Sequence, residues 1–457
     1  MPHPKLVAWA TGLLLALPAA QRPAAADGIG DARTLTPDAL VAAVESSNSN
    51  IAAIVAAAEA AASRLDAAGV LDDPMLAYSF APSTIGSDVG IRKMTELRQT
   101  LPWPGTRALE RTVAETVAGA AAEDVDLARL DAVAAAHSAF AEWYFVHRAI
   151  EINAASQVLL AELSRVASAR LAAGSGLQQD IVQAELERAL LEDRRLNLER
   201  ERAGLRARIN ALLTRAAEAP LPPPSGMPAP LALPALEAAR EAAAGQHPHL
   251  RHAHHALARA QAEAALAEKA FFPDFSVSVG YNDMWDEREM RTTLGVSINV
   301  PLGRDRRRAE LDAARADIRS AEHALADRRA EILAAFETAY AQAEQAIASI
   351  RLHEERLLRL AQDNLDAAVA DYRSGAGQFL SVVTAERQLL STQQGYERAR
   401  ADHWRARAEL QRAVGGPLPD ALAAHASGGP DRRARAHIPT RKGTPESSAV
   451  ITARESR

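Results

Sequence analysis

The sequence contains ARLAAGSGLQQDIVQAE at residues 169–185 and, much further along, ADYRSGAGQFLSVVTAE at residues 370–386. When Gly174 is aligned with Gly375, the second glycine of each pair, a valine, an alanine and a glutamate also coincide. Self-similarity at a fixed spacing is the mark of internal duplication. The sequence therefore predicts two copies of one long unit.

A second set of markers supports the duplication. Pro74 recurs as Pro273, and Pro102 recurs as Pro301. Both pairs are separated by the same number of residues, so the shift holds without gaps across this span. We therefore assign residues 27–217 to the first repeat and residues 237–418 to the second. Between them, residues 218–236 are rich in proline, which favours an extended, semi-rigid connector.

The beginning of the chain has the pattern of a secretory signal. Residues 1–26 contain Lys5, then an apolar run from Leu6 to Leu17, then small residues that include Ala24 and Ala26. This order predicts a signal peptide that is cleaved near Ala26. A membrane anchor is the poorer interpretation, because the apolar run is shorter than the roughly 20 residues that span a bilayer.

Composition excludes several classes of protein. The chain has no cysteine, so we expect neither disulfides nor a lipidated cysteine. No later segment approaches the roughly 18 consecutive apolar residues of a transmembrane helix, so membrane insertion would have to use strands. A net charge of −6 argues against a nucleic-acid partner. Residues 419–457 are polar and net basic, and we expect a disordered tail there.

Most of the remaining chain is rich in Ala, Leu, Glu and Arg, which is typical of long helices. The stretch from Thr106 to about Arg170 lacks proline and predicts a helix on the order of 90 Å long. From Phe336 onward, apolar residues recur at steps of four and three, as in a coiled-coil seam with Glu354 as one break: Tyr340, Ala343, Ile347, Ile350 and Leu357. Since glycine ends helices, each repeat should contain a long helical hairpin that turns at its glycine pair.

Each repeat also has one region with the two-residue period of β-strands, at 75–101 and at 274–300. Apolar and polar residues alternate there, which predicts one apolar and one polar face for each strand pair. The apolar positions are Leu76, Tyr78, Phe80, Leu97 and Leu101 in the first copy and Phe275, Val277, Val279, Tyr281, Leu294, Val296, Ile298 and Val300 in the second. The first copy is weaker, because Gln99 stands where the second copy has Ile298.

Two interpretations of these strands remain open. They can form soluble hairpins that pack on the helices, or strands that face lipid. In lipid every backbone hydrogen-bonding group must be paired, so only a closed barrel is allowed. Four strands are too few, because closure needs about eight. On the second interpretation several chains must share one barrel, and the helices extend away from the membrane.

The order of these features resembles the TolC-like outer membrane efflux proteins over residues 35–418. The resemblance is carried by the doubled plan, by LPWPGTR and VPLGRDRR after the strand pairs, and by the two glycine tips. It implies a mainly α fold with a small β part: a homotrimer with a shared twelve-stranded β-barrel in the outer membrane and a long α-helical barrel in the periplasm. It also implies a periplasmic adaptor and an inner-membrane pump as partners. QTLPWPG at residues 99–105 is similar to the CzcC-like heavy-metal branch, so metal cations are the expected substrate.

The resemblance also suggests functional residues at the tips. In the family the helix after each tip lines a periplasmic gate, where acidic rings attract cations. The matching positions here are Asp180, Ser381 and Thr384. Asp180 can equally be a carboxylate that stabilises a helix N-terminus. The tip glycines are expected either to dock the adaptor or only to shape the turns: Gly174, Gly176, Gly375 and Gly377. We expect Glu185 and Glu386 to be solvated charges.

Five histidines lie close together in GQHPHLRHAHHAL: His247, His249, His252, His254 and His255. His252 and His255 are three apart and could share a metal on a helix, but no nearby carboxylate completes a site. We therefore expect an exposed polar helix start and no metal site.

The sequence has no H-E-x-x-H, P-loop or nucleophile-elbow motif. The hypothesis is a non-enzymatic channel without a cofactor. A periplasmic coiled-coil adaptor or scaffold without a pore is the alternative.

Overall fold

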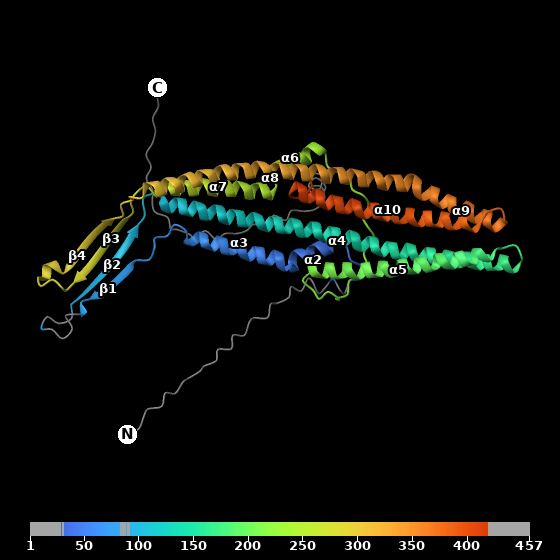
Figure 1. Cartoon of the computed structure of the whole chain (residues 1–457), viewed down its shortest axis with the longest axis horizontal. Helices are drawn as coiled ribbons and strands as arrows, with labels where there is room; N and C mark the ends of the chain where they lie inside the picture. Colours follow the sequence, from blue (N-terminus) through green and yellow to red (C-terminus); the bar gives the residue numbers. More distant parts are fainter. Residues whose placement is uncertain (1–28, 30–31, 83–87, 89–91, 419–457) are drawn as a thin grey trace, which may run out of the picture.

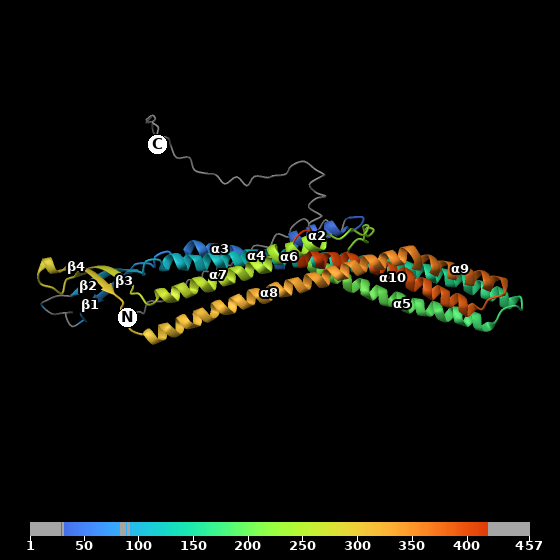
Figure 2. The same ribbon diagram turned by 90° about the horizontal axis from the view of Figure 1, so that it is seen from above.

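The computed structural model describes residue 29, residues 32–82, residue 88 and residues 92–418. The predicted signal peptide and the predicted tail lie outside the described residues. The described chain is elongated, with a small sheet at one end, a long helical body, and two helical turns together at the far end (Figures 1 and 2).

The helices and strands occur twice in the same order, which confirms the predicted pair of structural repeats. The first copy consists of α2 (Pro37–Ser47), α3 (Ser49–Ala67), β1 (Met75–Phe80), β2 (Lys93–Leu101), α4 (Thr106–Ala172) and α5 (Gln178–Leu212). The second copy consists of α6 (Leu236–Gln246), α7 (Pro248–Lys269), β3 (Phe275–Asn282), the short 3-10 turn η2 (Arg288–Met290), β4 (Thr292–Ile298), α8 (Arg304–Leu352), the π-helical turn η3 (His353–Leu357), α9 (Leu358–Ser374) and α10 (Phe379–Val414).

The continuous helix α4 organises the body. Its 67 residues correspond to roughly 100 Å at 1.5 Å per residue. Toward the sheet it packs against α3 and α7, and toward the far end it packs against α5 and α10. Helix α8 follows the same plan, since it packs first on α7 and then on α10. The shorter helices therefore succeed one another along the two long ones (Figure 1).

Buried side chains hold the helices together in three clusters. One cluster surrounds Phe140 and Trp143 in the middle of the body. A second surrounds Tyr372 and Phe379 toward the far end, and a third surrounds Phe336 where α6, α8 and α10 meet. Many of the remaining buried residues are alanines, which let helix backbones approach closely.

Among the described residues, no single helix is both long and apolar enough to cross a membrane. Helices α2 and α3 meet the criteria of length and composition only as a pair, and they are bent by 44° relative to each other. The bend lies at Asn48, whose side chain caps α3 by accepting hydrogen bonds from the backbone of Asn50 and Ile51. An Asn in the N-cap position separates two helices in this way.

The predicted coiled-coil seam is regular up to Ile350, and a π-helical turn interrupts it at the predicted break, Glu354. Phe336, Ala343 and Ile350 are buried, but the regular helix ends at Leu352, and η3 follows. A π-helical turn inserts an extra residue into the helix, and Leu357 at its end is half-buried, like Tyr340 and Ile347. The Tyr396 hydroxyl donates to the Glu354 carboxylate at 2.7 Å in this turn.

A buried polar network joins α4 to α10 at the centre of the body. The Glu397 carboxylate accepts hydrogen bonds from the Tyr144 hydroxyl at 2.6 Å and from Arg148 at 3.1 Å. Arg400 donates to Glu397 at 3.3 Å and to the carbonyl of Met227 in the connector at 2.8 Å. Burial and the neighbouring carboxylate raise the pKa of Tyr144 above its ordinary value. The network therefore ties both repeats and the connector together.

Candidate functional site

The four strands form one antiparallel sheet in the order β1-β2-β3-β4. Its register places apolar residues of neighbouring strands side by side, as in the row of Leu76, Leu97, Val279 and Leu294. The adjacent rows of the same face contain Leu101, Phe275 and Ile298, then Gln99, Val277 and Val296, then Tyr78, Thr95, Tyr281 and Thr292. The predicted apolar face therefore exists, with Gln99 as its expected polar interruption.

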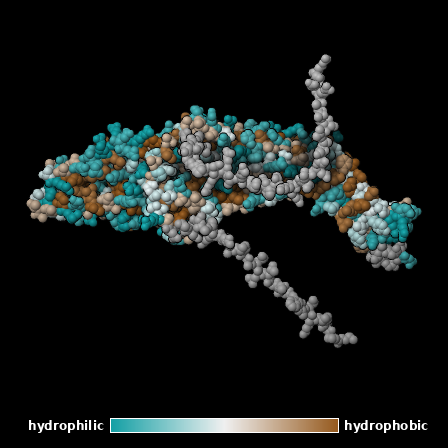
Figure 3. Space-filling view, turned by 180° about the vertical axis from the view of Figure 1, so that it is seen from behind, coloured by the Kyte–Doolittle hydropathy of each residue, from teal (hydrophilic) through white to brown (hydrophobic). Residues whose placement is uncertain are grey.

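This apolar face is exposed in the single chain. The exposed fractions are 86% for Leu294, 74% for Val296 and 68% for Leu76. In Figure 3 hydrophobic residues gather on the part of the sheet next to the helical body, and its outer end is more hydrophilic. Soluble hairpins packed on the helices would bury these side chains, so this alternative is wrong. A contiguous exposed apolar surface of this kind marks contact with lipid or with another chain.

The opposite face of the sheet is mainly polar. Its rows contain Thr100, Ser276 and Ser297, and next to them Arg98 and Ser278. Glu96 also belongs to this face and forms an ion pair with Arg98 at 2.8 Å. One face of the sheet thus suits an apolar solvent and the other suits water.

The sheet has two open edges. Strand β1 pairs only with β2, and β4 pairs only with β3. Each edge strand therefore presents backbone N–H and C=O groups that no strand in the described part of this chain pairs. Such an edge is a template for another strand.

At the far end of the molecule, two tight turns connect α4 to α5 and α9 to α10 (Figure 1). Gly174 and Gly375 have φ values of 72° and 85°, a conformation that favours glycine. The second glycine of each turn is required by space. A Cβ on Gly176 would lie 2.7 Å from the backbone N of Leu171, and one on Gly377 would lie 2.9 Å from Cβ of Asp371. Turn geometry alone accounts for all four glycines.

A hydrogen bond between the two helical hairpins lies next to these turns. The Tyr372 hydroxyl of α9 donates to the Asp180 carboxylate of α5 at 3.0 Å. Arg170 of α4 donates to the Tyr372 carbonyl, and its guanidinium lies 4.6 Å from the centroid of the tyrosine ring. The ring itself packs edge-on against Phe379 at 5.3 Å. Burial and the Asp180 carboxylate raise the pKa of Tyr372 to about 12.

The predicted gate residues are not brought together within one chain. Asp180 is half-buried and bonded to Tyr372, whereas Ser381 and Thr384 are exposed on α10. The sequence pattern did not indicate a role for Tyr372, although it lies three residues before Gly375. The bond has no counterpart in the other repeat. Alignment of the tips places Leu171 opposite Tyr372 and Ser381 opposite Asp180, so comparison of the repeats does not reveal it.

The expectation for the two glutamates is correct for Glu185, which is exposed, and wrong for Glu386, which is 3% exposed. Glu386 lies near Glu187, another buried carboxylate, which accepts a hydrogen bond from Nε of Arg387 at 2.9 Å. Burial raises the pKa of Glu386, and Glu187 adds to the shift, whereas a hydrogen bond with Ser156 opposes it. One Glu386 oxygen has no partner among the described residues.

This arrangement predicts a pH-dependent stability. The unfolded Glu386 loses its proton near the ordinary value of 4.5, while the folded one retains it to higher pH. The contribution of Glu386 to the free energy of unfolding is therefore greatest below pH 4.5. It decreases as the pH rises through the raised pKa of the folded state. Glu386→Gln should flatten this decline in thermal unfolding scans between pH 4 and pH 8. Glu185→Gln should leave the wild-type profile unchanged, and an equal response from both variants would contradict the assignment.

The expectation of an exposed helix start is wrong for His247, whereas His254 is exposed. His247 is 5% exposed and caps α7 by accepting a hydrogen bond from the backbone N–H of His249 at 3.1 Å. Burial, with a contribution from His249, lowers the pKa of His247 to about 4. His252 lies 3.6 Å from the carboxylate of Asp124. The expected absence of a nearby carboxylate was therefore wrong, because α4 supplies carboxylates that are distant in sequence.

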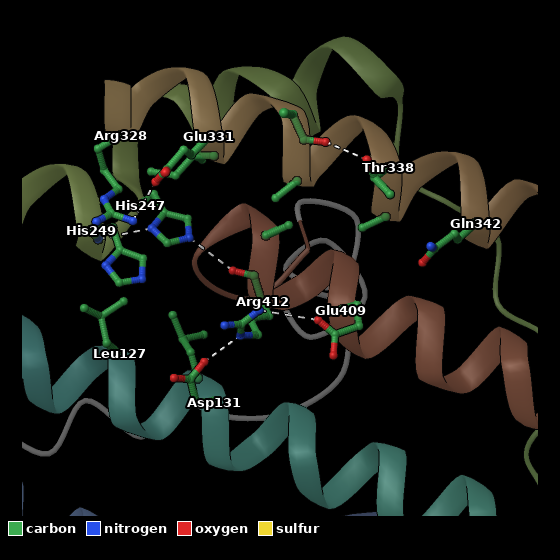
Figure 4. A pocket seen from close by; sticks show the side chains of 16 residues that line it. Leu127, Asp131, His247, His249, Arg328, Glu331, Thr338, Gln342, Glu409 and Arg412 are labelled. Atoms are coloured by element: carbon green, nitrogen blue, oxygen red, sulfur yellow. Dashed lines mark hydrogen bonds and ion pairs between the residues drawn. The ribbon is translucent and has the colours of Figure 1, made fainter. Parts of the chain in front are cut away.

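His247 and His249 border a cavity of about 550 Å³ between α4, α7, α8 and α10 (Figure 4). The charged side chains that line it pair with one another: Arg412 with Asp131 at 2.5 Å and with Glu409 at 3.6 Å, and Arg328 with Glu331 at 2.7 Å. Within the described part of the chain, no group of three or more His, Asp or Glu side chains is arranged to hold a metal ion.

Several solved outer membrane channels have this fold. The chain superposes on CusC with a TM-score of 0.73 at 17% identity, over 83% of this chain and 92% of that chain. For VceC of Vibrio cholerae the TM-score is 0.72 at 18% identity, over 84% and 96%. For MtrE of Neisseria gonorrhoeae it is 0.71 at 19% identity, over 84% and 89%. No curated protein matches the sequence. These superpositions establish the fold.

The sequence of the second repeat matches a known family. Residues 239–416 match the family model of the outer membrane efflux proteins. The second repeat therefore matches an outer membrane efflux protein domain, and the chain has the fold of the outer membrane channels described above. The predicted resemblance to the outer membrane efflux proteins is confirmed over these residues.

Proposed function

We propose that this chain is the outer membrane channel of a tripartite efflux system. The proposal rests on the sheet, which has one exposed apolar face, one polar face and two open edges at the end of a helical body roughly 100 Å long. The apolar face would contact lipid and the polar face would line a pore. The sheet then lies in the outer membrane and the helices extend into the periplasm, which agrees with the family.

The open edges support a shared barrel. Because β1 and β4 are the outer strands of a four-stranded antiparallel sheet, they run in opposite directions. Strand β4 of one copy can therefore pair antiparallel with β1 of the next. Three copies provide twelve strands, above the minimum of about eight that closure needs. Helix α5 also exposes an apolar stripe that a second copy would cover: Val182, Leu186 and Leu190.

The link at the tips supports a periplasmic gate. A hydrogen bond between Tyr372 and Asp180 holds the second hairpin against the first, so its loss should allow the tips to separate. In a trimer three copies of Asp180 would surround the entrance, where carboxylates attract cations. Ser381 and Thr384 would face the same entrance from α10. The exposed tips themselves would present a surface to a periplasmic adaptor.

Replacement of Tyr372 by Phe tests the gate. It removes the hydroxyl that donates to Asp180 and retains the ring that packs on Phe379. A hydrogen bond to a charged group contributes about 1.5–3 kcal/mol, so the closed form should lose about tenfold or more in relative population. Single-channel recordings should show a higher open probability. Tyr396→Phe, which removes a hydroxyl bond to Glu354 away from the tips, is the matched control. Equal recordings for both variants would argue against the gate.

Metal cations are the proposed substrate class. The support is the similarity of residues 99–105 to the CzcC-like branch and the carboxylate of Asp180, the acidic one of the three gate positions. An inner-membrane pump and a periplasmic adaptor would deliver the substrate. A periplasmic adaptor or scaffold without a pore is not favoured, because it gives no role to the exposed apolar face of the sheet.

One experiment decides between channel and scaffold. The full chain is expressed with its own N-terminus, extracted from the outer membrane fraction in detergent, and added to a planar bilayer. We expect a trimer that withstands mild detergent on gels and dissociates on heating, and stepwise conductance in the bilayer. A protein found only in the soluble periplasm, without conductance, would refute the channel.

A further inference from the structure

A second cavity lies between α4, α5 and the connector, away from the sheet and from the tips. Its volume is about 400 Å³, which is within the range of small-molecule sites. Trp143 and His147 of α4 form one side, Arg202 and Arg206 of α5 form another, and Leu221 of the connector closes a third. None of these residues has a role in the proposed channel.

The two arginines set the charge of this cavity. Arg202 and Arg206 are four residues apart on α5, so they extend from the same face of the helix. Neither has a hydrogen bond or an ion pair with any residue that the structure describes, and Nε of Arg206 is shielded from solvent. The one carboxylate in the lining, Glu199, is already bonded to Arg195 at 2.6 Å. Two positive charges are therefore left unbalanced.

The walls of the cavity are fixed in place. The Trp143 indole is 3% exposed, and its N–H donates to the carbonyl of Pro222 at 3.1 Å. The connector is fastened in turn to Leu35, whose N–H donates to the Pro223 carbonyl at 2.9 Å and whose carbonyl accepts from Ser225 at 2.7 Å. A ligand would meet a formed site and would not need to order a loop.

His147 completes the polar side. Its Nδ1 lies 2.8 Å from the Trp143 carbonyl, so Nδ1 carries the proton, and no residue in the described part of the chain hydrogen-bonds to Nε2. Burial lowers the pKa of His147, and the charge of Arg202 acts in the same direction. A bound anion would offset Arg202 and favour a proton on Nε2, which would then donate to the anion.

We propose that this cavity binds an organic anion, a small molecule whose carboxylate or phosphate group is held by Arg202 and Arg206 while its remainder packs against Trp143 and the proline-rich wall. Guanidinium groups bind such oxyanions through paired, charge-assisted hydrogen bonds. Because the ligand would touch α4, α5 and the connector at once, its binding would stabilise the joint between the two repeats. The site lies within one chain and does not depend on pore formation.

The test is titration calorimetry on the purified full-length protein in detergent. Sodium citrate and sodium phosphate serve as probes, each compared with sodium chloride at equal ionic strength. We expect saturable binding of at least one oxyanion, and the tighter probe identifies the group. The double variant R202Q/R206Q should weaken this binding by about tenfold or more. If that variant does not fold, as judged by its helical circular dichroism, R202Q alone replaces it.

The control is R200Q/R208Q, which removes the same charge from exposed arginines of the same helix. It should bind the probe like the wild type. Equal affinity in wild type and R202Q/R206Q, or an equal loss in the control, would overturn the proposal. Loss of trimer in R202Q/R206Q without anion uptake by the wild type would overturn it as well, because the arginines would then serve contacts between copies.

Discussion

Replacement of Val279 by arginine is expected to prevent the assembly of this protein in the outer membrane. Val279 occupies the middle of the apolar face, in the row formed with Leu97 and Leu294. An arginine facing lipid near the midplane costs about 2–4 kcal/mol, and a trimer would carry this cost three times. Heat-dissociable trimers in outer membrane fractions should therefore fall below a tenth of the wild-type amount.

The neighbouring residue provides the control. Ser278 precedes Val279 on β3 and belongs to the polar face. Ser278→Arg introduces the same side chain into the same strand, but toward the proposed pore, so trimers should form and the conductance should change. If both variants assemble equally well, the apolar face does not contact lipid.

Glu397→Ala is expected to have the largest effect on the stability of the helical body. The Glu397 side chain is only 6% exposed and accepts bonds from Tyr144, Arg148 and Arg400. Its removal leaves a buried tyrosine hydroxyl and two arginines without their shared acceptor. Breaking a buried ion pair in this way costs about 3 kcal/mol or more. The temperature at which the helical circular dichroism signal is lost should fall by several degrees.

Glu409→Ala is the matched control on the same helix. Glu409 lies 3.6 Å from Arg412 with 45% of its side chain exposed, and exposed ion pairs of this kind contribute at most about 1 kcal/mol. Its melting temperature should stay close to that of the wild type. Similar losses in both variants would mean that the central network adds no more than a surface pair.

The sequence was sufficient for the repeats, the tip turns and the alternation in the strands, because these features depend on residues close together in the chain. Gly174 is needed for its positive φ and Gly176 for a contact with Leu171 five residues earlier. Likewise, the alternation in the strands follows from the two-residue period of the backbone. The polar interruption of the apolar face at Gln99 could also be predicted, because the two-residue period places Gln99 on that face and the register puts it beside Val277.

The tertiary structure decided which polar groups are buried and which are joined. Glu386 follows its tip at the same distance as the exposed Glu185, yet it is enclosed because other helices cover that part of α10. The link between Tyr372 and Asp180 and the cap at His247 depend in the same way on contacts between distant segments. Burial is a property of what packs against a residue, and a local pattern of residues does not contain it.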